Sequence, residues 1–386
     1  MKKSLRHLIL LLIPGALVVV GFQNCGQSFS SLSSGGGGVT SPSSPTNVNV
    51  GLAQKVSAGS LHACVIKEDD LYCWGTNAEY ALGDGTTNKS VPTLVMTGGV
   101  TSVSAGVNTT CAIQNSKLYC WGRNAEGQLG DGTTTQRTTP TLAIGAGVNR
   151  VAVGDFHTCA IVNGGLQCWG QNVEGQLGDG TWVDSLTPFT VFASGVTAVV
   201  AARKNTCAIV SEALYCWGSG NNYILGDGTT TDYGTPHQIF DSGVQDVALG
   251  VNHICAIRNG ALFCWGENFW GQLGLNDTTQ RKTPVQAVAS GVSTIHVSTR
   301  HTCATISNIL NCWGGNSHSE VGNGSYVSET VPVSLGFDVS SVAVGVYFTC
   351  AISTSNVLKC WGRNDDNQLG DGTATQRETP TDILIL

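Results

Sequence analysis

The sequence predicts an all-β fold built from seven similar units, and three observations support this prediction. The tripeptide Cys-Trp-Gly occurs seven times, 47 residues apart once and then 48 residues apart five times, which is typical of one propeller blade. Each interval holds four short strand-like segments,. The 342 residues after position 44 are more than most domains with a single hydrophobic core contain. A ring of blades can reach this length because each blade packs mainly on its neighbours. We therefore expect a seven-bladed β-propeller of four-stranded antiparallel blades, with repeated tryptophans at Trp74, Trp121, Trp169, Trp217, Trp265, Trp313 and Trp361.

Residues 1–24 resemble an export signal. Two lysines and an arginine precede an apolar stretch at 8–20, which is too short to predict a membrane span. The stretch leads to Cys25, the only cysteine outside the repeats, as in bacterial lipoprotein signals, where this cysteine is acylated. Such signals usually have Gly, Ala or Ser where this chain has Asn24, so an ordinary signal peptide is the alternative. We expect an outer-membrane or cell-surface lipoprotein attached to the membrane through Cys25, or a periplasmic or secreted protein if Cys25 is not lipidated.

Two further segments follow the signal. Residues 25–44 are rich in Ser and Gly, with four consecutive glycines at 35–38. Such a composition buries too little apolar surface to fold, so it predicts a flexible tether. Residues 45–386 contain all the repeats and are expected to form the propeller.

The third unit displays the blade pattern most plainly. Strands are predicted at 148–154, 157–162, 165–170 and 188–192,. Between the second and third lies Asn163-Gly164, whose preference for left-handed backbone angles predicts a two-residue hairpin turn. The turn fixes the register of the blade.

This register determines how the repeat cysteines pair. Counting outward from the turn, Cys159 faces Cys168 at a non-hydrogen-bonded position, where Cα atoms approach to about 4.5 Å, and that distance suits a disulfide. Cys350 and Cys360 are one residue further apart, which predicts a three-residue turn centred on Ser355. An oxidising compartment favours disulfides. The seven predicted pairs are Cys64 with Cys73, Cys111 with Cys120, Cys159 with Cys168, Cys207 with Cys216, Cys255 with Cys264, Cys303 with Cys312, and Cys350 with Cys360.

Metal binding is the competing explanation for the cysteines. No Cys-x-x-Cys pair occurs, and two cysteines across a hairpin supply half of a tetrahedral zinc site. The recurring Leu-Gly-Asp-Gly-Thr at 129–133 could bind calcium, but it lacks the alternating acidic positions of calcium loops, so we interpret it as a turn capped by the aspartate. We predict no metal and no cofactor.

The position two residues before the first cysteine of each pair holds His62, His157, His253 and His301 in four units but Phe348 in another. A position that accepts phenylalanine indicates packing, not a ligand. We call this position the histidine slot.

Two segments compete for the last strand of the ring. The repeated fourth strand occurs eight times, whereas the rest of the unit occurs seven times. Either 47–50 or 382–386 therefore completes the last blade. We favour the C-terminal segment because it is more apolar and directly follows its own blade.

The repeats resemble those of the regulator of chromosome condensation family. The resemblance rests on Trp-Gly-x-Asn-x-x-Gly-Gln-Leu-Gly at 121–130 and 169–178, with close variants in the other blades, and covers 45–386. It implies a seven-bladed propeller that acts through surface contacts. Members include a nuclear guanine-nucleotide exchange factor and a secreted bacterial inhibitor of β-lactamases. If this chain is exported, it is more similar to the secreted inhibitor than to the nuclear exchange factor. Its paired cysteines depart from the pattern of that inhibitor.

One face of the ring is predicted to bind a partner. Because strands alternate in direction, the loop after the first strand and the loop after the third emerge on the same side. Large aromatic and basic residues replace small turn residues there, at different places in each blade, and such residues dominate protein interfaces. The candidate partner-binding residues are Tyr80, Phe156, Trp182, Arg203, Tyr223, Tyr233, Phe269, Trp270, Arg300, His318, Tyr326 and Tyr347.

Composition and motifs narrow the function. The formal charge is -7, with 19 Lys and Arg against 26 Asp and Glu, which argues against nucleic-acid binding. No recognised nucleophile, zinc-protease or phosphate-loop motif occurs, so we do not expect an enzyme. We expect a protein-binding propeller, which could act as an enzyme inhibitor. The alternatives are a carbohydrate-binding propeller at the cell surface and a hydrolase or lyase with a site spread across blades; a lectin would repeat one pocket in each blade.

Overall fold

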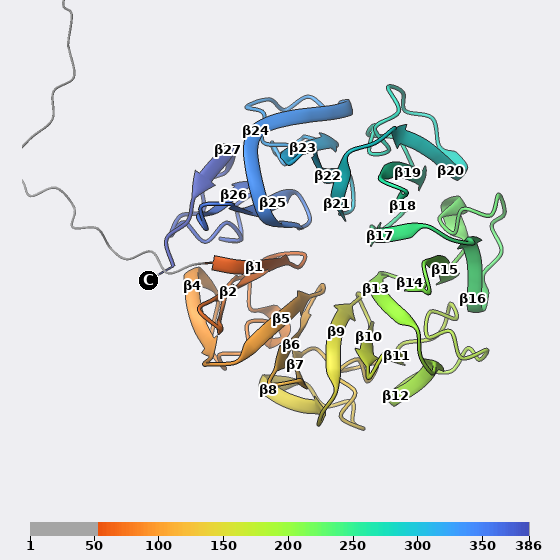
Figure 1. Cartoon of the computed structure of the whole chain (residues 1–386). Coiled ribbons are helices and arrows are strands. Elements are labelled where there is room, and N and C mark those ends of the chain that lie inside the picture. Colours follow the sequence, from red (N-terminus) through yellow and green to blue (C-terminus); the bar gives the residue numbers. More distant parts are fainter. Residues whose placement is uncertain (1–52, 386) are drawn as a thin grey trace, which may run out of the picture. The chain divides into compact units, whose positions relative to one another are not determined.

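The computed structural model describes residues 53–385 and arranges them as a ring of blades (Figure 1). The predictions for 1–24, for 25–44 and for Cys25 lie outside the described residues. Within each blade the strands follow one another in chain order from the centre of the ring outward (Figure 1). Among residues 53–385, no helix is long and apolar enough to cross a membrane.

Five blades are separate four-stranded antiparallel sheets. The first contains β1 (Ala53–Ala58), β2 (His62–Lys67), β3 (Asp70–Gly75) and β4 (Lys89–Met96). The second contains β5 (Val100–Ala105), β6 (Thr109–Gln114), β7 (Lys117–Gly122) and β8 (Arg137–Ile144). The third contains β9 (Val148–Val153), β10 (His157–Val162), β11 (Gly165–Gly170) and β12 (Ser185–Phe192). The fourth contains β13 (Val196–Ala202), β14 (Asn205–Val210), β15 (Ala213–Gly218) and β16 (Tyr233–Phe240). The fifth contains β17 (Val244–Leu249), β18 (His253–Arg258), β19 (Ala261–Gly266) and β20 (Arg281–Val288).

The sixth and seventh blades share one long strand. The sixth comprises β21 (Val292–Val297), β22 (His301–Ile306), β23 (Ile309–Gly314) and the first half of β24 (Glu329–Val344). The seventh comprises the second half of β24, β25 (Phe348–Ser353), β26 (Leu358–Gly362) and β27 (Arg377–Asp382). Because β24 pairs with β23 through its first half and with β25 through its second, these two blades form one seven-stranded sheet. The seven-bladed prediction is confirmed.

The hairpin register agrees with the prediction. Asn163 and Gly164 take φ values of 52° and 81°, as a type I′ turn requires, and Cys159 pairs with Cys168. All seven predicted cysteine pairs are disulfide-bonded, with Cα–Cα distances of 4.1 to 4.2 Å. Near Ser355, the Ser353 N–H donates to the Val357 carbonyl at 3.0 Å, which closes the predicted three-residue turn. The fourth strand of the third blade begins at Ser185, three residues earlier than predicted.

The C-terminal segment completes the last blade, as we favoured. Residues of β27 pair with β26, Lys359 opposite Asp382, and the Ile383 N–H donates to the Leu358 carbonyl at 2.8 Å. The paired strand begins at Arg377, ahead of the predicted 382–386. The competing segment at 47–50 lies outside the described residues.

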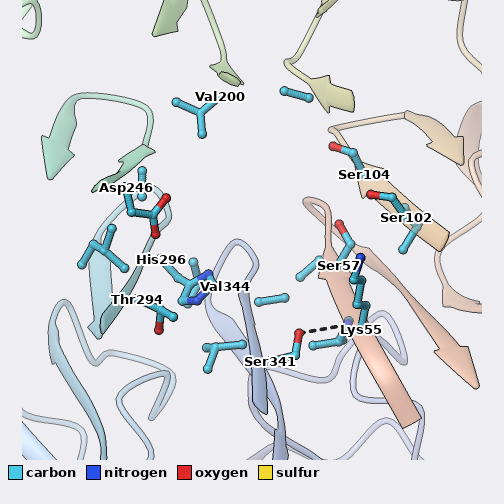
Figure 2. Close-up of a pocket in the computed structure, with 18 of the residues that line it drawn as sticks. Lys55, Ser57, Ser102, Ser104, Val200, Asp246, Thr294, His296, Ser341 and Val344 are labelled. Atoms are coloured by element: carbon cyan, nitrogen blue, oxygen red, sulfur yellow. Dashed lines mark hydrogen bonds between the residues drawn. The ribbon is translucent and has the colours of Figure 1, made fainter. Parts of the chain in front are cut away.

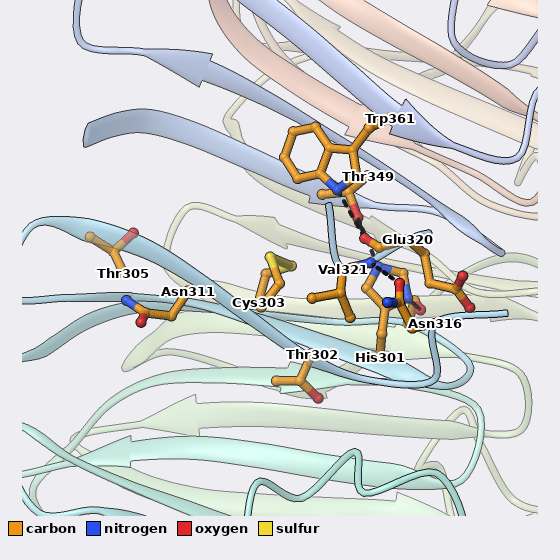
Figure 3. Close-up of a disulfide and its surroundings, with 12 residues drawn as sticks. His301, Thr302, Cys303, Thr305, Asn311, Asn316, Glu320, Val321, Thr349 and Trp361 are labelled. Atoms are coloured by element: carbon orange, nitrogen blue, oxygen red, sulfur yellow. Dashed lines mark hydrogen bonds between the residues drawn. A yellow bond between two sulfur atoms is a disulfide. The ribbon is translucent and has the colours of Figure 1, made fainter. Parts of the chain in front are cut away.

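A tryptophan hydrogen bond joins each blade to the one before it. All seven repeated tryptophans are fully buried, and each indole N–H donates to a backbone carbonyl in the long loop of the preceding blade. In the sixth-to-seventh contact, Trp361 Nε1 and Thr349 Oγ1 both donate to the Glu320 carbonyl, at 3.0 and 2.8 Å (Figure 3). The ring closes by the same bond, from Trp74 Nε1 to the Gln368 carbonyl at 2.9 Å.

The histidine slot is a packing position, as predicted. His157 is fully buried, and its Nε2 lies 2.8 Å from Thr206 Oγ1 of the next blade. Phe348 fills the same slot and is equally buried. The other histidines of this slot, His62, His253 and His301, make the same contact to a threonine of the next blade.

The repeated aspartate caps its turn, which agrees with our interpretation of 129–133. The Asp131 carboxylate accepts hydrogen bonds from the Thr133 N–H at 3.0 Å and from Arg137 Nε at 2.8 Å. Burial opposes ionisation, but these hydrogen bonds and the Arg137 charge lower the pKa of Asp131 overall. The carboxylate therefore holds the turn to the start of the fourth strand.

Candidate protein-binding face

Two sets of loops share one side of the ring, which we call the loop face. The Arg123 guanidinium from the long loop of the second blade lies 5.1 Å from the centre of the Phe156 ring, in the first loop of the third. Glu174 and Lys204 form an ion pair between the third and fourth blades in the same way. Long loops and first loops therefore interlock around the ring. The first loops are 59–61, 106–108, 154–156, 203–204, 250–252, 298–300 and 345–347, and the long loops are 76–88, 123–136, 171–184, 219–232, 267–280, 315–328 and 363–376.

Eleven of the twelve predicted residues lie in these loops. Arg203 is exposed, and Phe269 is the most exposed aromatic residue of the set, at 70%. Tyr80, Trp182, Trp270 and Tyr326 are also exposed. The remaining five, which are partly buried, are Phe156, Tyr223, Arg300, His318 and Tyr347.

Tyr233 has a structural role that the sequence prediction missed. It begins β16, and its hydroxyl donates to the Asp227 carboxylate at 2.8 Å while its ring stacks on His237 at 4.1 Å. The equivalent residue Arg137 binds Asp131 in the same manner. Tyr233 is therefore a partner of the turn aspartate, since the same position holds Asp-binding side chains in other blades.

One group of side chains on the loop face comes from three blades, and we call it the Arg300 cluster. The Arg300 guanidinium lies 4.8 Å from the centre of the Trp270 ring and 5.2 Å from that of Tyr347. His318 packs against Tyr347 with ring centroids 4.7 Å apart. Burial and the charges of Arg363 and Arg300 lower the pKa of His318, while Asp365 opposes them. The imidazole is therefore neutral near pH 7, and Arg300 is the cation of the cluster.

Two tyrosines adopt left-handed backbone angles that favour glycine. Tyr80 and Tyr223 have φ of 61° and 56°, where the second and third blades have Gly127 and Gly175. In those blades a glutamine side chain accepts the N–H two residues before it, as Gln128 does from Glu126 at 3.0 Å. The first and fourth blades have Ala81 and Ile224 instead of glutamine. These loops become the short helices η1 (Ala78–Tyr80) and η2 (Asn221–Tyr223).

The outer rim of the face holds two bulky side chains that reach the next blade. A Cβ built on Gly234 would lie 3.5 Å from the Trp182 indole, so this ring rests over β16. The Tyr326 hydroxyl donates to Glu378 of β27 at 2.6 Å. Both side chains keep about half of their surface exposed, 49% and 53%.

Sequence reasoning missed three residues that join neighbouring blades on this face. Arg123, Glu174 and Lys204 link neighbouring blades but were not candidates. Arg123 occupies the variable position after Trp-Gly, and that variability was the available signal. Which side chains contact each other could not be predicted, because the contacting residues lie about 30 positions apart in the sequence, in loops of different blades.

The centre of the ring forms a cavity of about 1290 Å³, lined by the first strand of every blade. Figure 2 shows Lys55, Asp246 and His296 among serine and threonine side chains that surround the open space. Burial raises the pKa of Asp246 to about 6, although hydrogen bonds to backbone N–H groups and the Arg150 charge oppose this. Burial lowers the pKa of His296 to about 4. The cavity was not predicted from the sequence.

Comparison with known families accounts for the repeated loops and blades. A sequence profile described as the Regulator of chromosome condensation (RCC1) repeat matches residues 68–113, 115–161, 211–257 and 259–305. A second profile of the same repeat matches 53–80, 100–128, 148–176 and 339–368. This chain belongs to the RCC1 repeat family. The predicted resemblance is confirmed. No curated protein matches this RCC1-repeat chain by sequence.

Solved structures of other proteins share the fold. Human WBSCR16 superposes on the RCC1-repeat chain with a TM-score of 0.73 and 20% identity, covering 82% of this chain and 94% of WBSCR16. Yeast RCC1 (Prp20), from its complex with Kap60, gives a TM-score of 0.72 and 21% identity, covering 87% and 85%. At this level of identity the similarity establishes the propeller architecture.

Proposed function

We propose that this RCC1-repeat propeller binds a protein partner through its loop face. The observation that carries the proposal is that large side chains differ in type and position from one long loop to the next, whereas the interior of every blade is nearly the same. A heterogeneous surface fits one asymmetric partner, and aromatic and arginine side chains are the usual anchors of such interfaces. Related propellers are described with protein partners, yeast RCC1 with Kap60 and Prp20p with Gsp1p and histones.

Carbohydrate binding is the second candidate, and the packing of the rings favours protein over sugar. Sugars stack on exposed aromatic faces, but cations lie over Phe156, Tyr223 and Trp270 in this structure. In addition, the large side chains of the long loops differ from blade to blade, whereas a lectin would repeat one pocket in each blade. A glycan array that gives specific binding, with no protein partner captured, would favour the lectin.

We further propose that the protein is exported and tethered to a membrane through Cys25. We also propose that its binding of a protein partner can inhibit an enzyme. The support is the signal-like sequence at 1–24 and the seven disulfides, which form in oxidising compartments,. Mass spectrometry of the mature N-terminus tests the anchor. An acylated Cys25 supports it, whereas an unmodified one leaves a periplasmic or secreted protein.

The decisive experiment for binding is capture of partners by the purified protein and by variants. We expect Trp182→Ala, Trp270→Ala and Tyr326→Ala together to abolish capture of a protein that the wild type retains. The matched control is Leu142→Ala with Phe189→Ala, since these side chains are exposed to a similar degree, 50% and 45%, but lie on the outer strands β8 and β12. Capture that survives the triple change, or that fails in the control, would contradict the choice of face.

A further inference from the structure

The Arg300 cluster is assembled from three blades, and its geometry is supported by a glycine that only the sixth blade has. The position after Trp-Gly holds Arg123, Glu267 and Arg363 in other blades but Gly315 in the sixth. A Cβ added to Gly315 would lie 3.0 Å from Arg300 Cβ and 3.6 Å from Trp270 Cβ. The glycine therefore leaves the space in which Arg300 packs against the Trp270 indole.

The guanidinium of Arg300 has no polar partner among residues 53–385. Two arginines of the long loops are neutralised within their own loops, Arg123 by Glu126 at 2.6 Å and Arg363 by Asp366 at 3.1 Å. Arg300 forms neither an ion pair nor a side-chain hydrogen bond with the described residues. Its guanidinium lies over the Trp270 and Tyr347 rings, which fix the cation but leave its N–H groups unused.

The buried acid Glu320, next to this cluster in the chain, forms no ion pair with Arg300. Glu320 is fully buried in a position where four other blades have glutamine, and its Oε2 accepts the His318 N–H at 2.7 Å. Burial raises the pKa of Glu320, although that hydrogen bond and the Arg300 charge oppose the rise. The environment therefore shifts Glu320 toward its neutral form, and it makes no ion pair with Arg300.

A guanidinium that is held by two aromatic rings and keeps its N–H groups free is suited to bind a carboxylate. The planar guanidinium presents paired N–H groups that match two carboxylate oxygens, and a preorganised arginine loses less rotamer entropy on binding. Phe269, beside the cluster and 70% exposed, offers an apolar contact next to the charge.

We propose that the Arg300 cluster is the subsite that receives an acidic side chain, or a C-terminal carboxylate, of the protein partner. This inference rests on the protein-binding function proposed above and names the chemistry of its partner. The ring faces are occupied by Arg300 itself, so the bound group meets guanidinium edges, with an apolar neighbour in contact with Phe269.

The test is a selection of peptides from a random library on the purified protein, followed by binding measurements on the selected peptides. We expect enrichment of Asp, Glu or a free C-terminus next to an apolar residue. Arg300→Gln should weaken binding by about tenfold or more, and Arg300→Lys should retain an intermediate affinity because it keeps the charge without the paired N–H groups. Asn or Gln in place of the selected acid should cause a loss similar to that of Arg300→Gln.

The control is Arg258→Gln. Arg258 also lies over a ring, 4.8 Å from the Phe240 centre, but it pairs with Asp241 beside the hairpins on the opposite side of the ring, so its loss should leave binding unchanged. A selection without acidic enrichment, a selection without binders, or full affinity in Arg300→Gln would overturn the inference. If Arg300→Gln still captures a partner that the Trp182, Trp270 and Tyr326 triple variant loses, the protein-binding function stands and only the carboxylate subsite fails.

Discussion

The contacts between blades and the loop face of the same ring follow opposite rules. Between blades, a buried tryptophan, a carbonyl acceptor and a close glycine recur at all seven junctions, including the closing one between Trp74 and Gln368. On the loop face, one position holds glycine in some blades and tyrosine in others, and the position before it holds glutamate in three blades but tryptophan or histidine in two others. The repeated contacts require one geometry, so their residues hardly vary. The loop face has no such requirement within the ring, so its differences point to a contact outside it.

The largest expected effect is acid destabilisation, which tests the repeated contacts as a set. Burial lowers the pKa of His62 and His157 to about 4 and, with the His301 charge added, that of His253 to about 3. His301 is lowered to about 3 by burial. Below pH 6.5 the unfolded chain binds protons that the folded chain excludes. The free energy of unfolding should therefore fall by about 1.4 kcal/mol per pH unit for each histidine, until the pH reaches the folded pKa.

The chain supplies its own control for this prediction. Phe348 fills the same slot in the seventh blade, so His157→Phe should be tolerated. Between pH 6.5 and 4 the variant's free energy of unfolding should fall less steeply with decreasing pH, by the contribution of one histidine. Denaturant unfolding at several pH values measures the slope. An unchanged slope in the variant would contradict the buried neutral state of His157.

The next largest loss of stability is expected from adding a single methyl group at a junction between blades. Gly130 has φ of 73°, and an added Cβ would lie 2.5 Å from Trp169 Nε1. Gly130→Ala should cost about 3 kcal/mol from overpacking in addition to about 1 kcal/mol from the left-handed backbone. Gly164→Ala, with φ of 81° and nothing within 4 Å, isolates the backbone cost. Equal losses of thermal stability in the two variants would show that the junction is not tightly packed.

Removal of one disulfide should cost less and should cost the same in every blade. Each of six bonds spans nine positions in sequence, and a loop of this length predicts about 2.5 kcal/mol or less. Cys159→Ala with Cys168→Ala and Cys303→Ala with Cys312→Ala should therefore lower stability equally. A large difference between the two blades would break the equivalence of the scaffold units.

The smallest expected effect on stability is at the loop face. Phe269→Ala removes a side chain that is 70% exposed, so the free energy of unfolding should change by less than about 0.5 kcal/mol. Partner binding should nevertheless weaken. A marked loss of thermal stability, measured by calorimetry, would show that Phe269 packs within the ring and would weaken its assignment to the interface.

Repetition explains how much could be predicted from the sequence. Seven copies of one unit were sufficient to predict the blades, the disulfides and the turn between Cys350 and Cys360, because each depends on residues close together in the chain. The contacts between loops could not be predicted, since Arg300 and Trp270 meet only when two blades pack. The role of Tyr233 within its own blade was not predicted because its aromatic ring suggested a surface anchor, whereas its hydroxyl replaces the arginine that binds the turn aspartate in other blades.

The proposed function requires that the loop face is the side that binds a protein partner. Hydrogen exchange of the purified protein, with and without the captured partner, tests this most directly. We predict slower exchange in the long loops at 171–184, 267–280 and 315–328 and no change in the hairpins on the opposite side. Slower exchange confined to the hairpins or to the outer strands would contradict it.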